Sequence, residues 1–305
     1  MNIRMHADDL GLSPALSAHI LGIHDAGALD SASMVVNYPG FMEVVQAVLE
    51  RPKLRTVLHL NIFEGKPVAS PERVALLLNA QGRFRFQFVD LWRTYLRANT
   101  EERQALGKAV ECEFEAQILH YRNAFPSLES LEVDSHVHFH MIPFVFDLLL
   151  SLAKRHPIRR IRTTREPFFF AREGGWSAFG PNLLKHLLLK WLTRRQADRL
   201  SAAGIETNDY LIGILHSGHM NFAAVTTGLA SLVDKDPQEV EILFHPGCAS
   251  QEEAANWPGR PEIFAFHSSP WRQQETEVLH RVALSGLLAQ YRSPAAIGTL
   301  QVKSQ

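Results

Sequence analysis

Two adjacent aspartates, Asp8 and Asp9, follow the first strand-like run of the chain, residues 2–7. If both carboxylates were desolvated, each would raise the pKa of the other, whereas a divalent cation bound by one makes it easier for the other to stay ionised. One aspartate could then bind a metal ion while its neighbour accepts a proton. The alternative is a helix cap or a solvated turn, but Ser13 and Pro14 already supply an N-cap and a first-turn proline.

Histidine is frequent, with 15 in the chain, and the run DSHVHFH holds three of them. In an extended strand, alternate residues point to one face, so His136, His138 and His140 would share a face with Asp134. Positions 136 and 140 would then be about 13 Å apart, too far to bind one ion unless the strand ends between them. Three neutral histidines buried together without partners are unfavourable, and a bound cation relieves this. We therefore expect a metal site with at most two of them as ligands.

Two further polar groups close later strand-like runs: His59 with Asn61, and His245 ahead of a Pro-Gly pair. Because the loops after parallel strands converge on one face, we expect these groups to lie near the aspartates. A carboxylate and two histidines on one ion leave positions for water and substrate, which suits amide or ester hydrolysis. Hydrolysis also needs a base and an acid. Asp8 suits the first role and His245 the second.

The stretch IRRIRTTRE places Arg162 and Arg165 near the end of another strand-like run. Either guanidinium could hold a substrate hydroxyl, carboxylate or phosphate. An ordinary surface ion pair explains them equally well.

At these residues the chain resembles the YdjC/ChbG family of carbohydrate deacetylases. Four motifs carry the resemblance, in the family's order and at similar spacing: ADDLGLS from residue 7, HLN from residue 59 with EGKP from residue 64, DSHVHFH from residue 134, and HPG from residue 245. The family's usual Phe after the two aspartates is Leu10 here. Residues 168–204 and the C-terminal part match poorly.

The resemblance implies a metal-dependent enzyme that removes the acetyl group from an N-acetylated sugar, often as a homodimer. Carried over by position, Asp9, His59 and His136 would bind one divalent ion, Mg or Zn, with Asp8 as the base and His245 as the acid. Which of the two aspartates is the ligand stays open. The resemblance leaves supporting or substrate-binding roles for His138 and His140, and we add to the substrate-binding candidates Asn61, Arg162 and Arg165.

The elements that must position these residues alternate between strand and helix. Strands are expected at residues 2–7, 31–37, 56–62, 130–136, 158–162, 210–216 and 240–245. Helices are expected near 14–27, 41–49, 101–122, 144–155, 222–233 and 276–291, with a loop over 64–99. This rhythm favours parallel β/α units and a single-domain TIM-like (β/α) barrel over residues 1–305, with room for distortion of the barrel. The segment 168–204, with its apolar helical run, is expected as an insertion packed over the barrel. A membrane-surface helix is the alternative.

The bulk composition fits an ordinary globular enzyme: 46% hydrophobic, 21% charged and a net charge of -1. Nothing is basic enough to predict nucleic-acid binding. Two cysteines are too few for a disulfide framework, and neither a signal peptide nor a membrane-spanning segment is expected, which together predict the cytoplasm. The apolar insertion leaves room for a lipid-linked sugar as substrate.

Two other functions compete with deacetylation. A two-histidine, one-carboxylate site also suits Fe(II), so an oxygenase or another metal-dependent hydrolase such as a phosphoesterase would carry similar residues. A catalytically silent metal- or sugar-binding protein is the third possibility. The intact candidate residues disfavour it, because a silent homologue is free to lose them.

Overall fold

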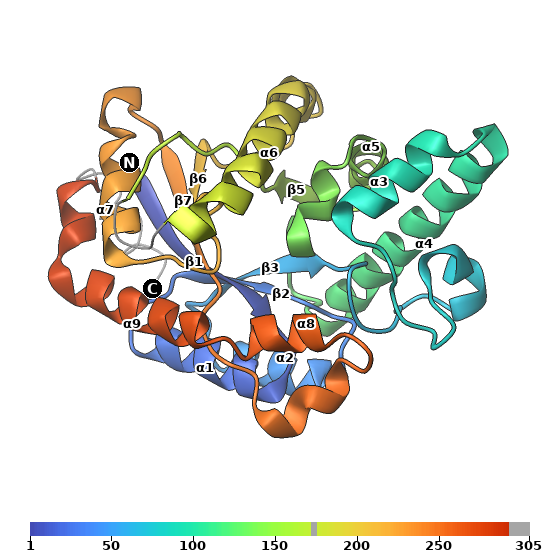
Figure 1. Cartoon of the computed structure of the whole chain (residues 1–305), viewed down its shortest axis with the longest axis horizontal. Coiled ribbons are helices and arrows are strands. Elements are labelled where there is room, and N and C mark those ends of the chain that lie inside the picture. The colour runs from blue at the N-terminus through green and yellow to red at the C-terminus, as the bar shows by residue number, and fades with distance from the viewer. Residues whose placement is uncertain (172–175, 293–305) are drawn as a thin grey trace.

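The structure is a computed structural model that describes residues 1–171 and 176–292. Its centre is a curled sheet surrounded by helices (Figure 1). Seven parallel strands lie in the order β5-β4-β3-β2-β1-β7-β6. Their bounds are β1 (Asn2–Leu10), β2 (Ser31–Met34), β3 (Arg55–Leu60), β4 (Leu131–Ser135), β5 (Ile158–Ile161), β6 (Tyr210–Ile212) and β7 (Glu239–Phe244). Each falls within or beside an expected strand, so the α/β class with parallel strands is confirmed.

The helices connect and cover these strands. The α-helices are α1 (Pro14–Asp25), α2 (Phe41–Leu49), α3 (Phe88–Arg97), α4 (Thr100–Ala124), α5 (Pro143–Ala153), α6 (Trp176–Ala202), α7 (Phe222–Ala230), α8 (Pro261–His267) and α9 (Pro270–Ser285). Short 3-10 turns are η1 (Pro71–Leu77), η2 (His136–Met141), η3 (Val233–Lys235), η4 (Gln251–Asn256) and η5 (Leu287–Gln290).

The two edges of the sheet, β5 and the segment leading into β6, meet through irregular hydrogen bonds. Arg160 forms an isolated parallel bridge with Glu206, and the Leu211 amide donates to the Arg165 carbonyl at 2.8 Å. Between them, the Asn208 side chain accepts from the Thr163 amide at 2.8 Å and donates to its carbonyl at 3.0 Å. The fold is therefore barrel-like, with seven strands among the described residues instead of the eight of a TIM barrel.

Strand β1 shows how the sequence sorts side chains between the two faces of the sheet. Ile3 and Met5 point outward into the main hydrophobic core, whereas Arg4 points inward, where it pairs with Glu239 at 2.6 Å. His6 and Asp8 continue the inward row, because alternate strand residues share a face. The inner face thus carries buried ion pairs near the start of the strands and the candidate site at their carboxyl ends.

The local structure departs from expectation at three places. The expected loop over 64–99 contains α3, whose Tyr95 stacks on Phe144 at a ring distance of 3.9 Å. Helix α8 was not expected. The extended reading of DSHVHFH fails because β4 ends at Ser135 and the chain turns into η2, where Val137 and His138 have φ values of 53° and 58°. The alternation of side chains along a strand therefore does not determine which way these histidines point.

The expected insertion forms the connection between β5 and β6, and its helix is α6. Leu189 and Leu192 of α6 pack with Leu211, Leu243 and Met141 in a small apolar cluster. Leu243 pairs in register with His6, so this cluster lies on the inner face of the sheet. Helix α6 thus covers the inner side of β6 and β7.

Candidate metal centre and catalytic site

A break in β1 directs both aspartates toward the same site. Neighbouring residues of a regular strand point to opposite faces. Here the pairing of β1 with β2 shifts between Ala7 and Leu10, and Asp9 has a φ of 76°, in the left-handed region that non-glycine residues rarely adopt. This bulge turns Asp9 toward the inner rim beside Asp8. Both side chains are buried.

Asp8 is held as a carboxylate by a buried arginine. Arg162 Nη1 donates to both of its oxygens, at 2.9 and 3.1 Å, and His6 Nε2 lies 3.2 Å from Oδ1. Burial alone would raise the pKa of Asp8, but Arg162, His59 and His6 together hold that pKa well below its usual range. Asp8 is therefore ionised at neutral pH and able to accept a proton.

Asp9 keeps one oxygen available. Its Oδ2 accepts from Arg272 Nη1 at 2.9 Å. Its Oδ1 lies 3.1 Å from His136 Nδ1, yet has no hydrogen-bond partner among the described residues. Arg272 holds the pKa of Asp9 well below its usual range although burial opposes this. Asp9 thus offers a charged oxygen that faces His136, itself a candidate ligand.

His59 and His136 are each oriented by a carboxylate. His59 Nδ1 lies 2.5 Å from Asp134 Oδ1, and its Nε2 is buried without a hydrogen-bond partner in the described part of the chain. His136 Nε2 lies 2.8 Å from Glu64 Oε1, which leaves Nδ1 facing Asp9. A carboxylate on the far nitrogen is the usual support of a metal-binding imidazole, because it fixes the ring and raises its basicity.

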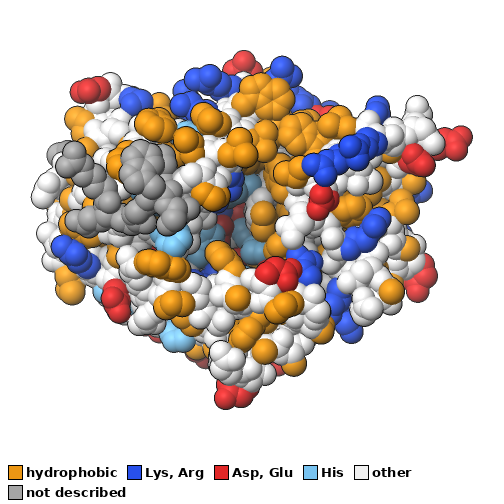
Figure 2. Space-filling model, viewed as in Figure 1, with side chains coloured by type: hydrophobic (Ala, Val, Ile, Leu, Met, Phe, Trp, Pro, Cys, Tyr) orange, Lys and Arg blue, Asp and Glu red, His pale blue; other side chains and the backbone are white. Residues whose placement is uncertain are grey.

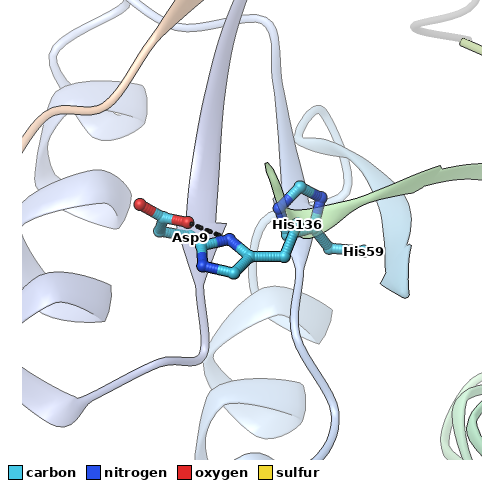
Figure 3. Close-up of side chains that lie close together, drawn as sticks. All are labelled: Asp9, His59 and His136. Carbon is cyan, nitrogen blue, oxygen red and sulfur yellow. Dashed lines mark ion pairs between the residues drawn. The ribbon is translucent and has the colours of Figure 1, made fainter. Parts of the chain in front are cut away.

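The three side chains meet from three separate segments. One ligand atom from each of Asp9, His59 and His136 lies within 4.8 Å of the others, and Figure 3 shows the two rings and the carboxylate gathered at the strand ends. One carboxylate and two imidazoles with unshared atoms form a donor set that divalent metals accept. The residues therefore fit the ion that the sequence predicted.

The proton balance of His136 depends on whether a metal is bound. Burial lowers its pKa, but the contacts with Asp9 and Glu64 outweigh burial and raise the pKa to about 10. Without an ion, His136 thus carries the positive charge between the two carboxylates. A metal would have to displace that proton.

His245 and His138 lie at the same rim with unused nitrogens. The Nδ1 atom of each has no hydrogen-bond partner among the described residues. The His245 amide donates to Glu275 Oε2 at 2.5 Å, which fixes the loop after β7. Burial, with smaller contributions from Arg272 and Lys185, lowers the pKa of His245 to about 4, and burial holds the pKa of His138 well below its usual range. Both rings are neutral at pH 7.

The remaining predicted substrate residues are largely engaged within the protein. The Asn61 side chain accepts from the amides of Phe63 and Glu64, and it donates to the Glu64 carbonyl and the Asn37 side chain. These bonds fix the loop that follows β3. His140 uses both ring nitrogens, on Ser135 Oγ at 2.6 Å and the Arg162 carbonyl at 3.0 Å.

The two predicted arginines differ in position. Arg162 pairs with Asp8, Asp134 and Glu241 inside the sheet, so its role is to hold carboxylates in place. Arg165 is exposed, and its guanidinium lies over the Tyr210 ring at 5.0 Å. Of the pair, only Arg162 contacts the carboxylate–histidine cluster directly.

The sequence reading missed a second group of residues. Glu64 Oε2 accepts hydrogen bonds from Tyr38 and Trp257. Glu64 Oε1 contacts His136 and His267, so this carboxylate holds the His136 ring in place. The Glu64-Gly65 pair of the second motif was the sequence signal that could have pointed to Glu64. Residues of α8 and α9, His267 and Arg272, carried no motif, so only the tertiary structure places them.

Figure 2 shows the site from outside as a hollow with histidine, acidic and basic side chains at its base and apolar side chains around much of its rim. Such an opening suits a ligand with a polar group to be processed and less polar faces to be held.

Comparison with known proteins settles the family. A family model described as YdjC-like protein matches residues 2–290. The chain belongs to the YdjC-like family. Among its curated relatives is a mouse carbohydrate deacetylase, 27% identical over 93% of this chain and 89% of the relative. The sequence resemblance is thus confirmed at the level of the family.

Bacterial YdjC-like relatives match over a shorter range. A carbohydrate deacetylase of Brevibacillus brevis is 29% identical over 57% of this chain, and one of Halalkalibacterium halodurans is 31% identical over 52%. The chain spans 62% and 63% of these two relatives. A solved structure from Enterococcus faecalis V583, described as a candidate cellobiose-phosphate cleavage protein, covers 94% of both chains with a TM-score of 0.68 and 20% identity. That likeness shows a shared fold.

Proposed function

We propose that this protein is a metal-dependent carbohydrate deacetylase that hydrolyses the amide of an N-acetylated sugar. The observation that carries the proposal is the meeting of Asp9, His59 and His136 within 4.8 Å, with unshared ligand atoms and a carboxylate behind each histidine. The names of the family relatives support the choice of substrate and reaction.

Asp9, His59 and His136 would hold one divalent ion. When bound, the ion would lower the pKa of water and polarise the amide carbonyl. Two imidazole ligands suit Zn better than Mg, the other ion expected, because Mg prefers oxygen ligands. Asp134 and Glu64 keep the two rings oriented.

Asp8 is proposed as the general base. Its oxygen Oδ2 lies 3.8 Å from His59 Nε2, so the carboxylate faces the same space as the candidate ligands. Arg162 fixes its orientation and keeps it ionised. His245, which follows β7 beside the end of β1, is proposed as the acid that faces the leaving nitrogen.

The test is acetate release from N-acetylated mono- and oligosaccharides, measured without oxygen and with or without a chelator. We expect release that stops on chelation and returns with Zn or Mg. Release that needs oxygen would favour an oxygenase, and the absence of any release from the whole panel would contradict the proposal.

Metal affinity should rise with pH. Because His136 must lose a proton whose pKa is about 10, each pH unit between about 6 and 9 should tighten binding roughly tenfold. Titration against a competing chelator at several pH values measures this. Glu64→Gln should make the rise level off at a lower pH, since it removes one carboxylate that favours the proton. An affinity that is constant over this range would contradict the assignment of His136.

Three finer expectations accompany the proposal. The exposed side chains of Leu184 and Leu187 on α6 support a lipid-linked substrate. Homodimer formation and cytoplasmic location are proposed from the sequence alone. Among the described residues, the structure has no helix with the length and apolar character that crossing a bilayer requires.

A further inference from the structure

Two aromatic side chains are exposed where α8 is followed by α9. Phe266 of α8 is 40% exposed and Trp271 of α9 is 44% exposed. An exposed ring leaves apolar surface in contact with water, which is unfavourable. Single exposed apolar residues are nevertheless common on protein surfaces, so exposure alone assigns no role. The position of this pair beside the candidate site is what distinguishes it.

Phe266 lies against the candidate site. Its ring centroid is 6.1 Å from that of His245, the proposed acid, and the two rings meet edge to face. The guanidinium carbon of Arg272 lies 5.5 Å from the Phe266 ring centroid, and Arg272 Nη1 donates to Asp9 Oδ2 at 2.9 Å. Because Arg272 is buried, the exposed surface of Phe266 lies on the side of the ring away from this guanidinium.

The loop after β6 connects Phe266 with Trp271. A Cβ atom on Gly218 would lie 3.7 Å from Phe266 Cε2, so this loop passes close to the Phe266 ring. The next residue, His219, meets Trp271 with the ring centroids 4.3 Å apart. Phe266 and Trp271 therefore flank the same short stretch of chain, and Trp271 lies one contact further from His245. We call Phe266 and Trp271 the aromatic strip.

The proposed reaction brings the sugar to the same side as the aromatic strip. The leaving group of sugar deacetylation is the amine of the sugar itself, so the sugar ring must lie beside the acid that protonates its nitrogen. The proposed acid is His245, which Phe266 contacts. A saccharide that begins at His245 can continue outward along the aromatic strip. Figure 2 shows apolar side chains around much of the rim of the hollow.

Aromatic rings are suited to holding a saccharide. The faces of a pyranose ring carry C–H groups, whereas its hydroxyl groups lie around its edge. Stacking such a face on an aromatic ring removes apolar surface of both partners from water and leaves the hydroxyls free to form hydrogen bonds. An aromatic side chain also loses little conformational freedom on binding, because only two torsion angles orient it.

We propose that the aromatic strip is a saccharide-binding subsite, an inference that rests on the proposed deacetylase function. Phe266 holds the sugar that carries the acetamide group, and Trp271 holds the next sugar of the chain. An oligosaccharide gains a stacking contact that a monosaccharide cannot make. The enzyme therefore prefers an N-acetylated oligosaccharide to the corresponding monosaccharide.

The test measures kcat and KM for acetate release from the matched monosaccharide, disaccharide and trisaccharide of each N-acetylhexosamine in the panel, N-acetylglucosamine first. Trp271→Ala should raise KM for the oligosaccharides about tenfold and change KM for the monosaccharide, and kcat for all substrates, by less than about twofold. Trp271→Phe should restore most of the lost affinity, because it keeps a flat aromatic face. Phe266→Leu should raise KM for all three lengths, with metal content measured on the same preparation.

Trp191→Ala is the matched control. Trp191 is 43% exposed, much like Trp271, but its ring stacks on Trp92 at 6.3 Å and lies under the Arg195 guanidinium. Its loss should leave every KM at the wild-type value. Calorimetry with the same monosaccharides and disaccharides measures binding directly, and we expect the wild type to bind each disaccharide more tightly than its monosaccharide.

The outcomes separate this inference from the proposed function. A wild type that binds the disaccharide through Trp271 but releases no acetate contradicts the deacetylase function and leaves the subsite standing. An active wild type with equal affinity for both lengths, or an unchanged KM in Trp271→Ala, contradicts only the subsite. An equal loss in Trp191→Ala also contradicts it. If Trp271→Ala changes the oligomeric state in light scattering and keeps its saccharide affinity, the strip is a contact between copies of the protein, which overturns the subsite.

Discussion

Replacing His136 with alanine is expected to abolish metal binding and acetate release together. His136 offers Nδ1 beside Asp9 Oδ1, and no other imidazole of the described residues takes this place between Asp9 and Glu64. We expect bound metal, measured by elemental analysis after gel filtration, to fall below one tenth of the wild-type content, and turnover to fall by at least about 10²-fold. The loss should persist at pH 9, because the variant lacks the ligand itself.

A matched control for this variant is His120→Ala. His120 lies on α4, where its ring packs beside Phe41. It should leave both metal content and turnover near wild type. A His136→Ala protein that retains its metal, with a normal thermal unfolding curve, would contradict the proposed ligand set.

The second large effect is expected for Asp8→Asn, which should keep the metal and lose the rate. Asparagine can still accept a hydrogen bond from Arg162, so the local structure should survive, but its amide cannot take a proton from water. The fall in kcat should be about 10²- to 10⁴-fold, the usual contribution of a general base. Metal content and kcat are measured on the same preparation.

Asp25→Asn, a surface substitution beside Arg51, controls for the chemical change itself. It should leave metal content and kcat unchanged. If Asp8→Asn instead loses the ion and Asp9→Asn keeps it, the roles of the two aspartates must be exchanged. The proximity of Asp8 Oδ2 to His59 Nε2, 3.8 Å, makes this comparison informative.

The sequence predicted the elements whose signals are local. Strand and helix alternation follows from side-chain periodicity, and the seven strands fell where apolar and β-branched residues cluster. Helix α3 does have an apolar side, on which Phe88, Trp92 and Tyr95 pack against the core beside the buried Leu91. Its helical periodicity was therefore a local signal that the loop prediction missed. The extended reading of DSHVHFH failed because the positive φ values of Val137 and His138 depend on the packing of η2 and cannot be read from residue types.

By itself, the sequence determined the family, the parallel β/α class and the polar residues at the strand ends, because motifs and periodicity are properties of neighbouring residues. Only the tertiary structure decided how those residues work. The bulge at Asp9 aligns two adjacent aspartates, and Arg272, 263 residues away, occupies one oxygen of Asp9 and leaves the other free. Charge states depend on burial and on partners distant in the chain: burial lowers the pKa of His245, whereas Asp9 and Glu64 raise the pKa of His136.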